Sequence, residues 1–268
     1  ITKYFEMLSE DSVLKAAYRD MLACPNKELK HKLQKSLREA MRPGDINVNI
    51  MTKLDRDNYD AKGNLLPPEY SDGLAALRGY AQSKLRSAIE FSAGFNRRLY
   101  AYIEQFKDFY ADASGDIKKK IIIKVSDFRS TMIQGKFLAK KGVWISEYRI
   151  ESGLNCGGHA FATDGFLMGP IMDEFKTKRQ QFIEDLHKVY NEALKMKNKL
   201  PFVQPHSVII TAQGGIGTYK EDSFIRKHYA LDGTGWGTPM LLCPEVTNVD
   251  DKTMEKLSKA TEKDLYLS

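Results

Sequence analysis

Apolar and polar residues repeat with two different periods along the chain, and the periods predict helices and strands that follow one another. The first stretch, residues 4–41, has the spacing of helices. It is broken at Pro25 and Asn26 and ended by Pro43 and Gly44. No residue in it suggests chemistry. We therefore assign residues 1–44 to a helical N-terminal segment, which packs on the remainder, residues 45–268, or continues into it.

Beyond this segment, alternating or continuous apolar runs predict six strands, and each is followed by a helical pattern. The expected strands are 46–53, 87–94, 120–125, 144–150, 207–212 and 231–242. The expected helices are 74–85, 98–110, 131–141, 164–199, 222–229 and 253–263. Alternation of this kind indicates a parallel sheet with right-handed crossovers.

The fold class we expect is α/β, a (β/α)8 TIM barrel, because the residues suited to chemistry follow the strands. Such a barrel needs two more strands than the six seen, and we expect the missing two to lie upstream of Ile1. The connection 55–73 is long and polar, which is typical of a lid or binding loop. The role of that loop, and of the extra helical stretch 175–199, stays open.

Composition places the chain among ordinary soluble globular proteins, with 42% hydrophobic and 28% charged residues. No apolar run approaches the roughly 18 residues of a membrane span, and no secretory signal is visible. The three cysteines are widely spaced, which argues against a disulfide framework and for a reducing, cytoplasmic compartment. No cluster of Cys and His indicates zinc, so we expect no metal.

The net charge of +6 could attract nucleic acid or a small anion. The basic residues are interspersed with acidic ones, as in 27–32 and 176–179, so we interpret most of them as solvated helix faces. The run Lys118–Lys120 leads into an apolar strand and reads as a charged gatekeeper against aggregation. We expect a small-molecule substrate, without nucleic acid or membrane, and leave a homo-oligomer open.

The most informative stretch is Glu151–His159, which follows strand-forming residues and holds Gly157, Gly158 and His159. Glycines let a backbone approach a ligand closely, and a histidine at the end of a strand is a common way to present chemistry. The alternative is a glycine-rich turn with a solvent-facing histidine.

Two later glycine-rich segments follow the next two strands and favour a phosphate site. Their residues are Gln213, Gly214, Gly215, Ile216 and Gly217, and then Gly235, Trp236, Gly237 and Thr238. Backbone N–H groups freed by glycine, backed by a helix N-terminus, suit a phosphate dianion. The alternative is a pair of tight turns that need positive φ. Trp236 packs against a ligand or plugs the end of the barrel.

Together these three segments resemble the nitronate monooxygenase family of FMN-dependent barrels, over about residues 45–245. The matching positions are Gly153, Gly157, Gly158 and His159, then Ala212, Gly214, Gly215 and Ile216, and then Gly237 and Thr238. Asn49 stands where the family's third strand has Val-Asn. The departures are Ser152, Asn155, Cys156 and Gln213; we interpret Cys156 as a small buried residue.

The resemblance implies that the loops after the last two strands hold the FMN phosphate. It also implies that His159 lies near the flavin and removes a proton from the substrate carbon. The expected activity is therefore an FMN-dependent oxidoreductase, and Asn49, Gly157 and Gly158 are expected at the cofactor.

Lys124 lies within an apolar strand and has three interpretations. It could stabilise negative charge on reduced flavin, form an imine in a lyase or aldolase-type barrel, or pair with Glu90 or Glu151 on neighbouring strands. A further alternative is a barrel without catalysis, retained as a subunit of an assembly.

Overall fold

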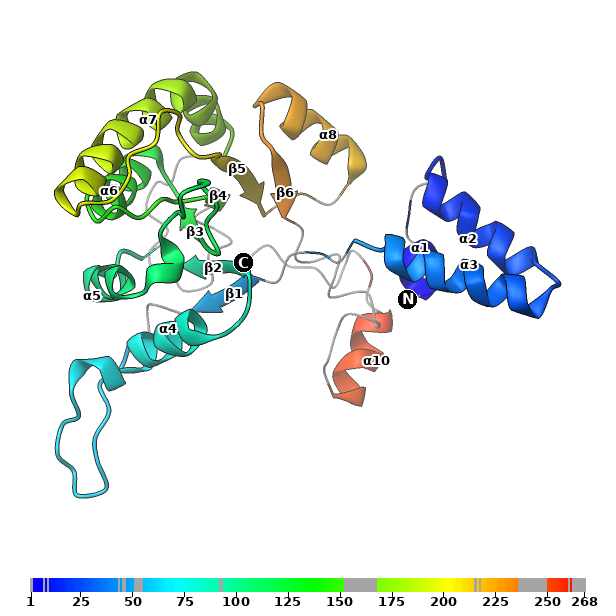
Figure 1. Ribbon diagram of the computed structural model, residues 1–268, viewed down its shortest axis with the longest axis horizontal. Helices are drawn as coiled ribbons and strands as arrows, with labels where there is room; N and C mark the ends of the chain where they lie inside the picture. The colour runs from blue at the N-terminus through cyan, green and yellow to red at the C-terminus, as the bar shows by residue number, and fades with distance from the viewer. Residues whose placement is uncertain are drawn as a thin grey trace. The chain divides into compact units, whose positions relative to one another are not determined.

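The computed structural model describes residues 2–6, 8, 10–42, 44, 47–50, 55–91, 94–151, 168–214, 216, 218–235, 250–259 and 261. The chain divides into two compact units, Ile1–Asp45 and Ile46–Ser268 (Figure 1). Each unit has its own buried apolar cluster.

The first unit contains the helices α1 (Thr2–Glu6), α2 (Val13–Ala23) and α3 (Lys27–Ala40). The break expected near Pro25 is present. Asn26 begins α3, and its side chain accepts a hydrogen bond from the Leu29 amide at 3.0 Å, as an N-cap residue does. The small core consists of Phe5, Tyr18, Met21 and Leu37.

The described residues of the second unit form a sheet of six parallel strands paired in chain order. They are β1 (Asn47–Ile50), β2 (Ser87–Phe91), β3 (Lys119–Val125), β4 (Glu147–Glu151), β5 (Ile209–Gln213) and β6 (Gly233–Gly235). In a doubly wound sheet the strand order would reverse at one point, and here it does not. Crossovers between parallel strands are right-handed as a rule, so steps that run in one direction place the connecting helices of the described residues on one face of the sheet.

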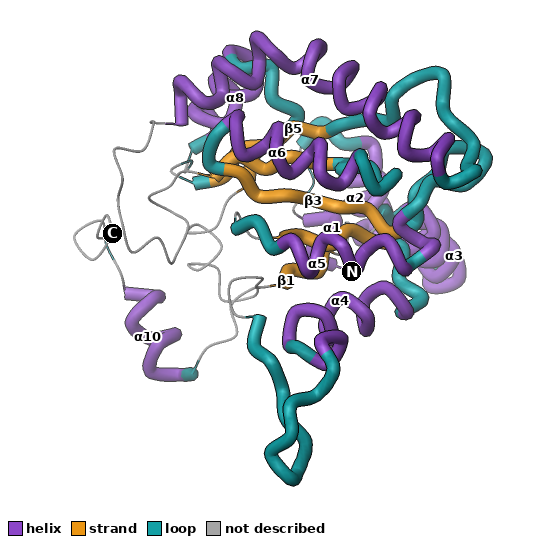
Figure 2. Tube along the Cα trace, turned by 90° about the vertical axis from the view of Figure 1, so that its left-hand side faces the viewer, coloured by secondary structure: helices purple, strands orange, loops and turns teal. Residues whose placement is uncertain are grey.

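Among the described residues of this unit, the helices are α4 (Asp72–Gln82), α5 (Arg97–Tyr102), α6 (Phe128–Ala139), α7 (Met168–Met196), α8 (Tyr219–His228) and α10 (Asp251–Lys259). Figure 2 shows α6 and α7 lying over the strands. The described part also contains the short 3-10 turns η2 (Pro68–Tyr70), η3 (Ile103–Gln105) and η4 (Lys107–Phe109). None of the described helices is long and apolar enough to cross a membrane.

The expectation of an α/β fold with a curled parallel sheet is confirmed for these six strands, and closure into a (β/α)8 barrel remains a prediction. One element differs. The helix expected at 98–110 ends at Tyr102 and continues as 3-10 turns η3 and η4. Phe106 lies between the two turns in an extended conformation, and the turns bury Ile103 and Phe109 in the core.

The core lies between the sheet and the helices. Alternate strand residues face it, including Ile89 and Phe91 of β2, Ile121 and Ile123 of β3, and Tyr148 and Ile150 of β4, all fully buried. Because side chains alternate along a strand, the residues between them face the opposite side of the sheet. Those residues are mostly polar, and they form the candidate site.

Candidate functional site

The face of the sheet turned away from the helices carries a row of charged and polar side chains. The strand register pairs Lys124 of β3 with Arg149 of β4 and Thr211 of β5. Two residues further toward the carboxyl ends of the strands, Glu151 of β4 pairs with Gln213 of β5, and Gln213 pairs with Gly235 of β6. Register partners in a parallel sheet point to the same face, so four strands contribute to one polar surface.

Ion pairs connect this surface into one network of alternating charge. The Lys124 Nζ lies 3.2 Å from Glu151 Oε1 and 3.8 Å from Glu90 Oε1. Arg149 reaches Glu90 at 2.7 Å and Glu147 at 2.9 Å. All five side chains are largely buried, and Glu151 is 5% exposed. Buried charges of this kind persist because each lies beside a partner of opposite sign.

Uncharged side chains complete the network at its β5 edge. Thr211 Oγ1 donates a hydrogen bond to Glu147 at 2.7 Å. Gln213 Nε2 donates one to Glu151. Gln213 departs from the motif of the family that the sequence resembles, and its partner Glu151 is the first residue of the stretch Glu151–His159. Gln213, the last residue of β5 before the glycine-rich segment, is thereby connected to Lys124 through Glu151.

The ion pairs bear on one of the three interpretations of Lys124. Pairing with carboxylates on neighbouring strands is confirmed, and it involves both Glu90 and Glu151. The flavin-stabilising role and the imine-forming role of Lys124 both stay predictions.

Two glycines of the expected phosphate site lie at the carboxyl ends of adjacent strands: Gly214 directly follows β5, and Gly235 ends β6 beside Gln213. Gly214 has φ of +104°, a conformation that side chains rarely adopt. Gly235 lacks room for a side chain, because a Cβ there would lie 2.9 Å from Gln213 Cβ. Glycine is therefore needed at both positions, at Gly214 for its backbone conformation and at Gly235 because the Gln213 side chain fills the adjoining space.

The helix behind the loop contributes less to anion binding than expected. Thr218 and Glu221 form a capping box at the start of α8, so the amide groups of both residues already donate hydrogen bonds to side chains. The carboxylates of Glu221 and Asp222 also lie in the first turn, where a negative charge already complements the helix dipole. A phosphate here would depend mainly on amide groups of the loop 214–217.

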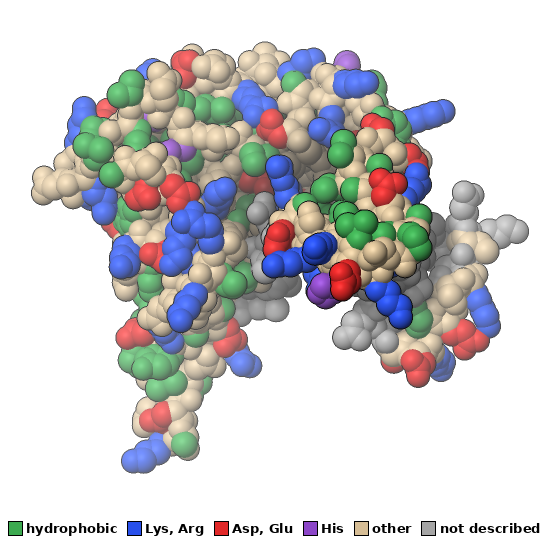
Figure 3. All heavy atoms as spheres, turned by 45° about the vertical axis from the view of Figure 1, so that its right-hand side comes forward, with side chains coloured by type: hydrophobic (Ala, Val, Ile, Leu, Met, Phe, Trp, Pro, Cys, Tyr) green, Lys and Arg blue, Asp and Glu red, His purple; other side chains and the backbone are tan. Residues whose placement is uncertain are grey.

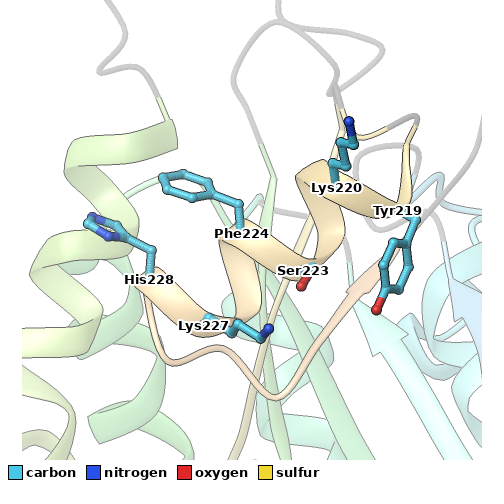
Figure 4. A pocket seen from close by; sticks show the side chains of 6 residues that line it. All are labelled: Tyr219, Lys220, Ser223, Phe224, Lys227 and His228. Carbon is cyan, nitrogen blue, oxygen red and sulfur yellow. The ribbon is translucent and has the colours of Figure 1, made fainter.

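A shallow pocket of about 510 Å³ lies along α8, immediately after this loop (Figure 4). It is lined by Tyr219, Lys220, Ser223, Phe224, Lys227 and His228, all from one helix. The rings of Phe224 and His228 stack at 5.0 Å between centroids, whereas Tyr219 points away from them (Figure 4). Because these side chains diverge, we place the candidate site at the sheet edge and not in this pocket.

The remaining predicted site residues are distributed as follows. Asn49 is an exposed residue of β1 beside Glu90, and Ile216 is buried within the loop after β5. Outside the described residues lie Gly157, Gly158, His159, Gly215, Gly217, Trp236, Gly237 and Thr238. The structure thus brings together Lys124, Gln213, Gly214 and Gly235. Among the residues it describes, no group of His, Cys, Asp and Glu could hold a metal ion.

No family model and no curated protein matches the chain.

Sequence reasoning missed Glu147, Arg149 and Thr211 as members of the polar network. The sequence did contain a signal. Polar residues occupy every second position of 147–151, and in 209–213 the polar residues Thr211 and Gln213 are also two positions apart. Alternation of this kind predicts a strand with one polar face. It does not show that the polar side chains of neighbouring strands bind one another, since that depends on register.

Proposed function

We propose that the chain is an FMN-dependent oxidoreductase, resembling nitronate monooxygenases, that oxidises a small organic substrate in the cytoplasm. The observation that carries the proposal is that glycines occur at the carboxyl ends of two adjacent parallel strands, where Gly235 of β6 pairs with Gln213 of β5 and Gly214 follows directly. Phosphate-bearing ligands bind at this edge in parallel α/β folds, and in barrels the phosphate site lies after the last strands.

In this proposal the amide groups of the loop 214–217 hold the FMN phosphate, with the segment 235–238 beside it. When bound, FMN accepts the electrons that leave the substrate. Lys124 supplies a fixed positive charge on the same face of the sheet, which favours negative charge developing nearby. Glu151 and Glu90 hold that ammonium group in place. His159 removes a proton from the substrate carbon, since imidazole titrates near neutrality.

The absorbance spectrum of the purified protein tests cofactor binding. We expect bands near about 370 and 450 nm that belong to flavin, and release of FMN on denaturation. Gly235→Val should weaken FMN binding about tenfold or more, because the added side chain collides with Gln213 and shifts the ends of β5 and β6. Gly79→Ala, in a helix with open space around the new methyl group, is the matched control and should bind FMN like the wild type.

A second variant separates binding from chemistry. His159→Ala should retain FMN but lose turnover of nitronate substrates by about a hundredfold or more, because the proton acceptor is removed. A colourless wild-type protein that also fails to take up added FMN would refute the proposed function.

A further inference from the structure

The connection between β1 and α4 forms an ordered projection, which we call the arm (residues 55–72). Its two sides meet in an antiparallel bridge between Tyr59 and Leu65. The Asp60 carboxylate accepts hydrogen bonds from the Lys62 and Asn64 amides, both at 2.8 Å, and closes the tip. Figures 1 and 2 show the arm extending away from the sheet, past α4.

The base of the arm is held by charged and polar groups. Asp55 accepts hydrogen bonds from the Gly73 amide at 3.0 Å and from Arg98 at 2.9 Å. Arg98 also reaches Asp57 at 3.1 Å. Asn58 Nδ2 donates to the Tyr70 carbonyl at 2.8 Å across the two sides. These contacts order the arm before any partner binds. A preorganised element loses little conformational entropy on binding.

This rigid arm exposes apolar side chains to solvent. Tyr59 is 62% exposed, and Leu65, its partner in the bridge, is 61% exposed. Figure 3 shows hydrophobic side chains and charges of both signs on the projection at its lower left. Burying Tyr59 and Leu65 against another protein would remove their apolar surface from water, which favours such a contact.

A groove of complementary character lies where α6 and α7 end. Its volume is about 370 Å³, and its lining residues are Glu104, Phe137, Lys140, Lys141, Ala193, Met196 and Lys197. Met196 is 84% exposed, and with Phe137 and Ala193 it forms an apolar part of the lining. The lysines supply a positive rim, in which Lys141 and Lys197 share the single carboxylate of Glu104.

The charges of the two features are complementary. Asp55 and Asp57 pair with Arg98 at the base of the arm, and Asp72 pairs with Arg56. The other charged residues of the arm are Asp60, Lys62 and Glu69, which carry a net charge of −1. An acidic arm with an apolar bridge matches a lysine-rimmed groove with an apolar lining. Both belong to the same chain, so a second copy offers each of them a partner.

We propose that the arm of one copy docks in the α6–α7 groove of a second copy, and that the reciprocal contact closes a two-fold dimer. Two-fold symmetry lets each copy donate one arm and receive one, which ends the assembly at two chains. The proposal is independent of FMN binding.

Sedimentation velocity over a range of protein concentrations tests the dimer. The wild type should dimerise, and added salt should weaken the dimer because the contact is partly ionic. The double variant Tyr59→Ser, Leu65→Ser and the groove variant Met196→Asp should each raise the dimer dissociation constant about tenfold or more. Tyr219→Ser, which replaces an aromatic residue that is 78% exposed on α8, is the matched control and should dimerise normally.

A mixing experiment identifies the partner of the arm. Groove-defective chains keep an intact arm, and arm-defective chains keep an intact groove. A mixture of the two should therefore recover part of the dimer through one intact contact. Lys140→Glu, on the exposed rim, provides a second groove variant should Met196→Asp fail to fold. A wild type that stays monomeric, or an arm variant that loses the dimer while both groove variants keep it, would overturn the proposal.

Discussion

His206 shows at the scale of one residue how burial couples a side chain to pH. It lies against Trp144 and Phe202, with ring centroids 5.7 and 4.5 Å away, and its Nε2 lies 3.2 Å from the Tyr190 hydroxyl. Burial lowers the pKa of His206 below its ordinary value of 6.5, and the nearby His187 lowers it further.

The lowered pKa predicts a loss of stability in mild acid. Below about pH 6.5 the unfolded chain binds a proton at His206 that the folded chain does not, so the free energy of unfolding should fall until the pH passes the folded pKa. Urea unfolding at pH 7.5 and 5.5 measures this. His206→Asn should reduce the difference in the free energy of unfolding between pH 7.5 and pH 5.5. His31→Asn, at an exposed position of α3, should leave this difference unchanged. If the free energy of unfolding fell equally between pH 7.5 and pH 5.5 in the wild type and in His206→Asn, His206 would not be the source of the loss.

Lys119 is a residue whose environment the sequence did not reveal. The gatekeeper interpretation is wrong for this lysine, because its side chain is fully buried, whereas Lys120 is exposed. Its ammonium group donates to Ser83 Oγ at 2.7 Å and lies 4.3 Å from the centre of the Tyr80 ring. Burial lowers the pKa of Lys119. The hydrogen bond and the ring offset part of the cost of burying the charge.

At the scale of elements, the close packing of α6 against β4 and α7 depends on one glycine. A Cβ at Gly135 of α6 would lie 2.7 Å from the Tyr148 hydroxyl oxygen and 3.1 Å from Leu186 of α7. Tyr148 is fully buried in the core, so it has little freedom to move aside. The glycine is needed here for space, since the helix conformation itself does not require it.

Gly135→Ala should therefore lower the free energy of unfolding by about 1–3 kcal/mol, the usual cost of overpacking a core. Gly79→Ala, in the middle of α4 with nothing near the new methyl group, should instead raise it by about 0.5–1 kcal/mol through helix propensity alone. Chemical denaturation of the two variants measures both. A neutral Gly135→Ala would show that α6 can shift without cost.

At the scale of the whole molecule, the two units have separate cores. No described residue belongs to both apolar clusters. We expect a chain that begins at Ile46 to keep the near-ultraviolet circular dichroism of the larger unit and its unfolding temperature within about 2 °C. A drop of about 8 °C or more would show that residues 1–45 stabilise the sheet.

The succession of helices and strands, and two positions that need glycine, follow from the sequence alone. Periodicity is local, so six strands, their order and the glycines at 214 and 235 could be read from the chain. Which polar side chains form ion pairs with one another depends on the tertiary structure. Lys124 contacts Glu90 and Glu151 because parallel register sets their strands side by side, and residues 34 and 27 positions away carry no local sign of that pairing.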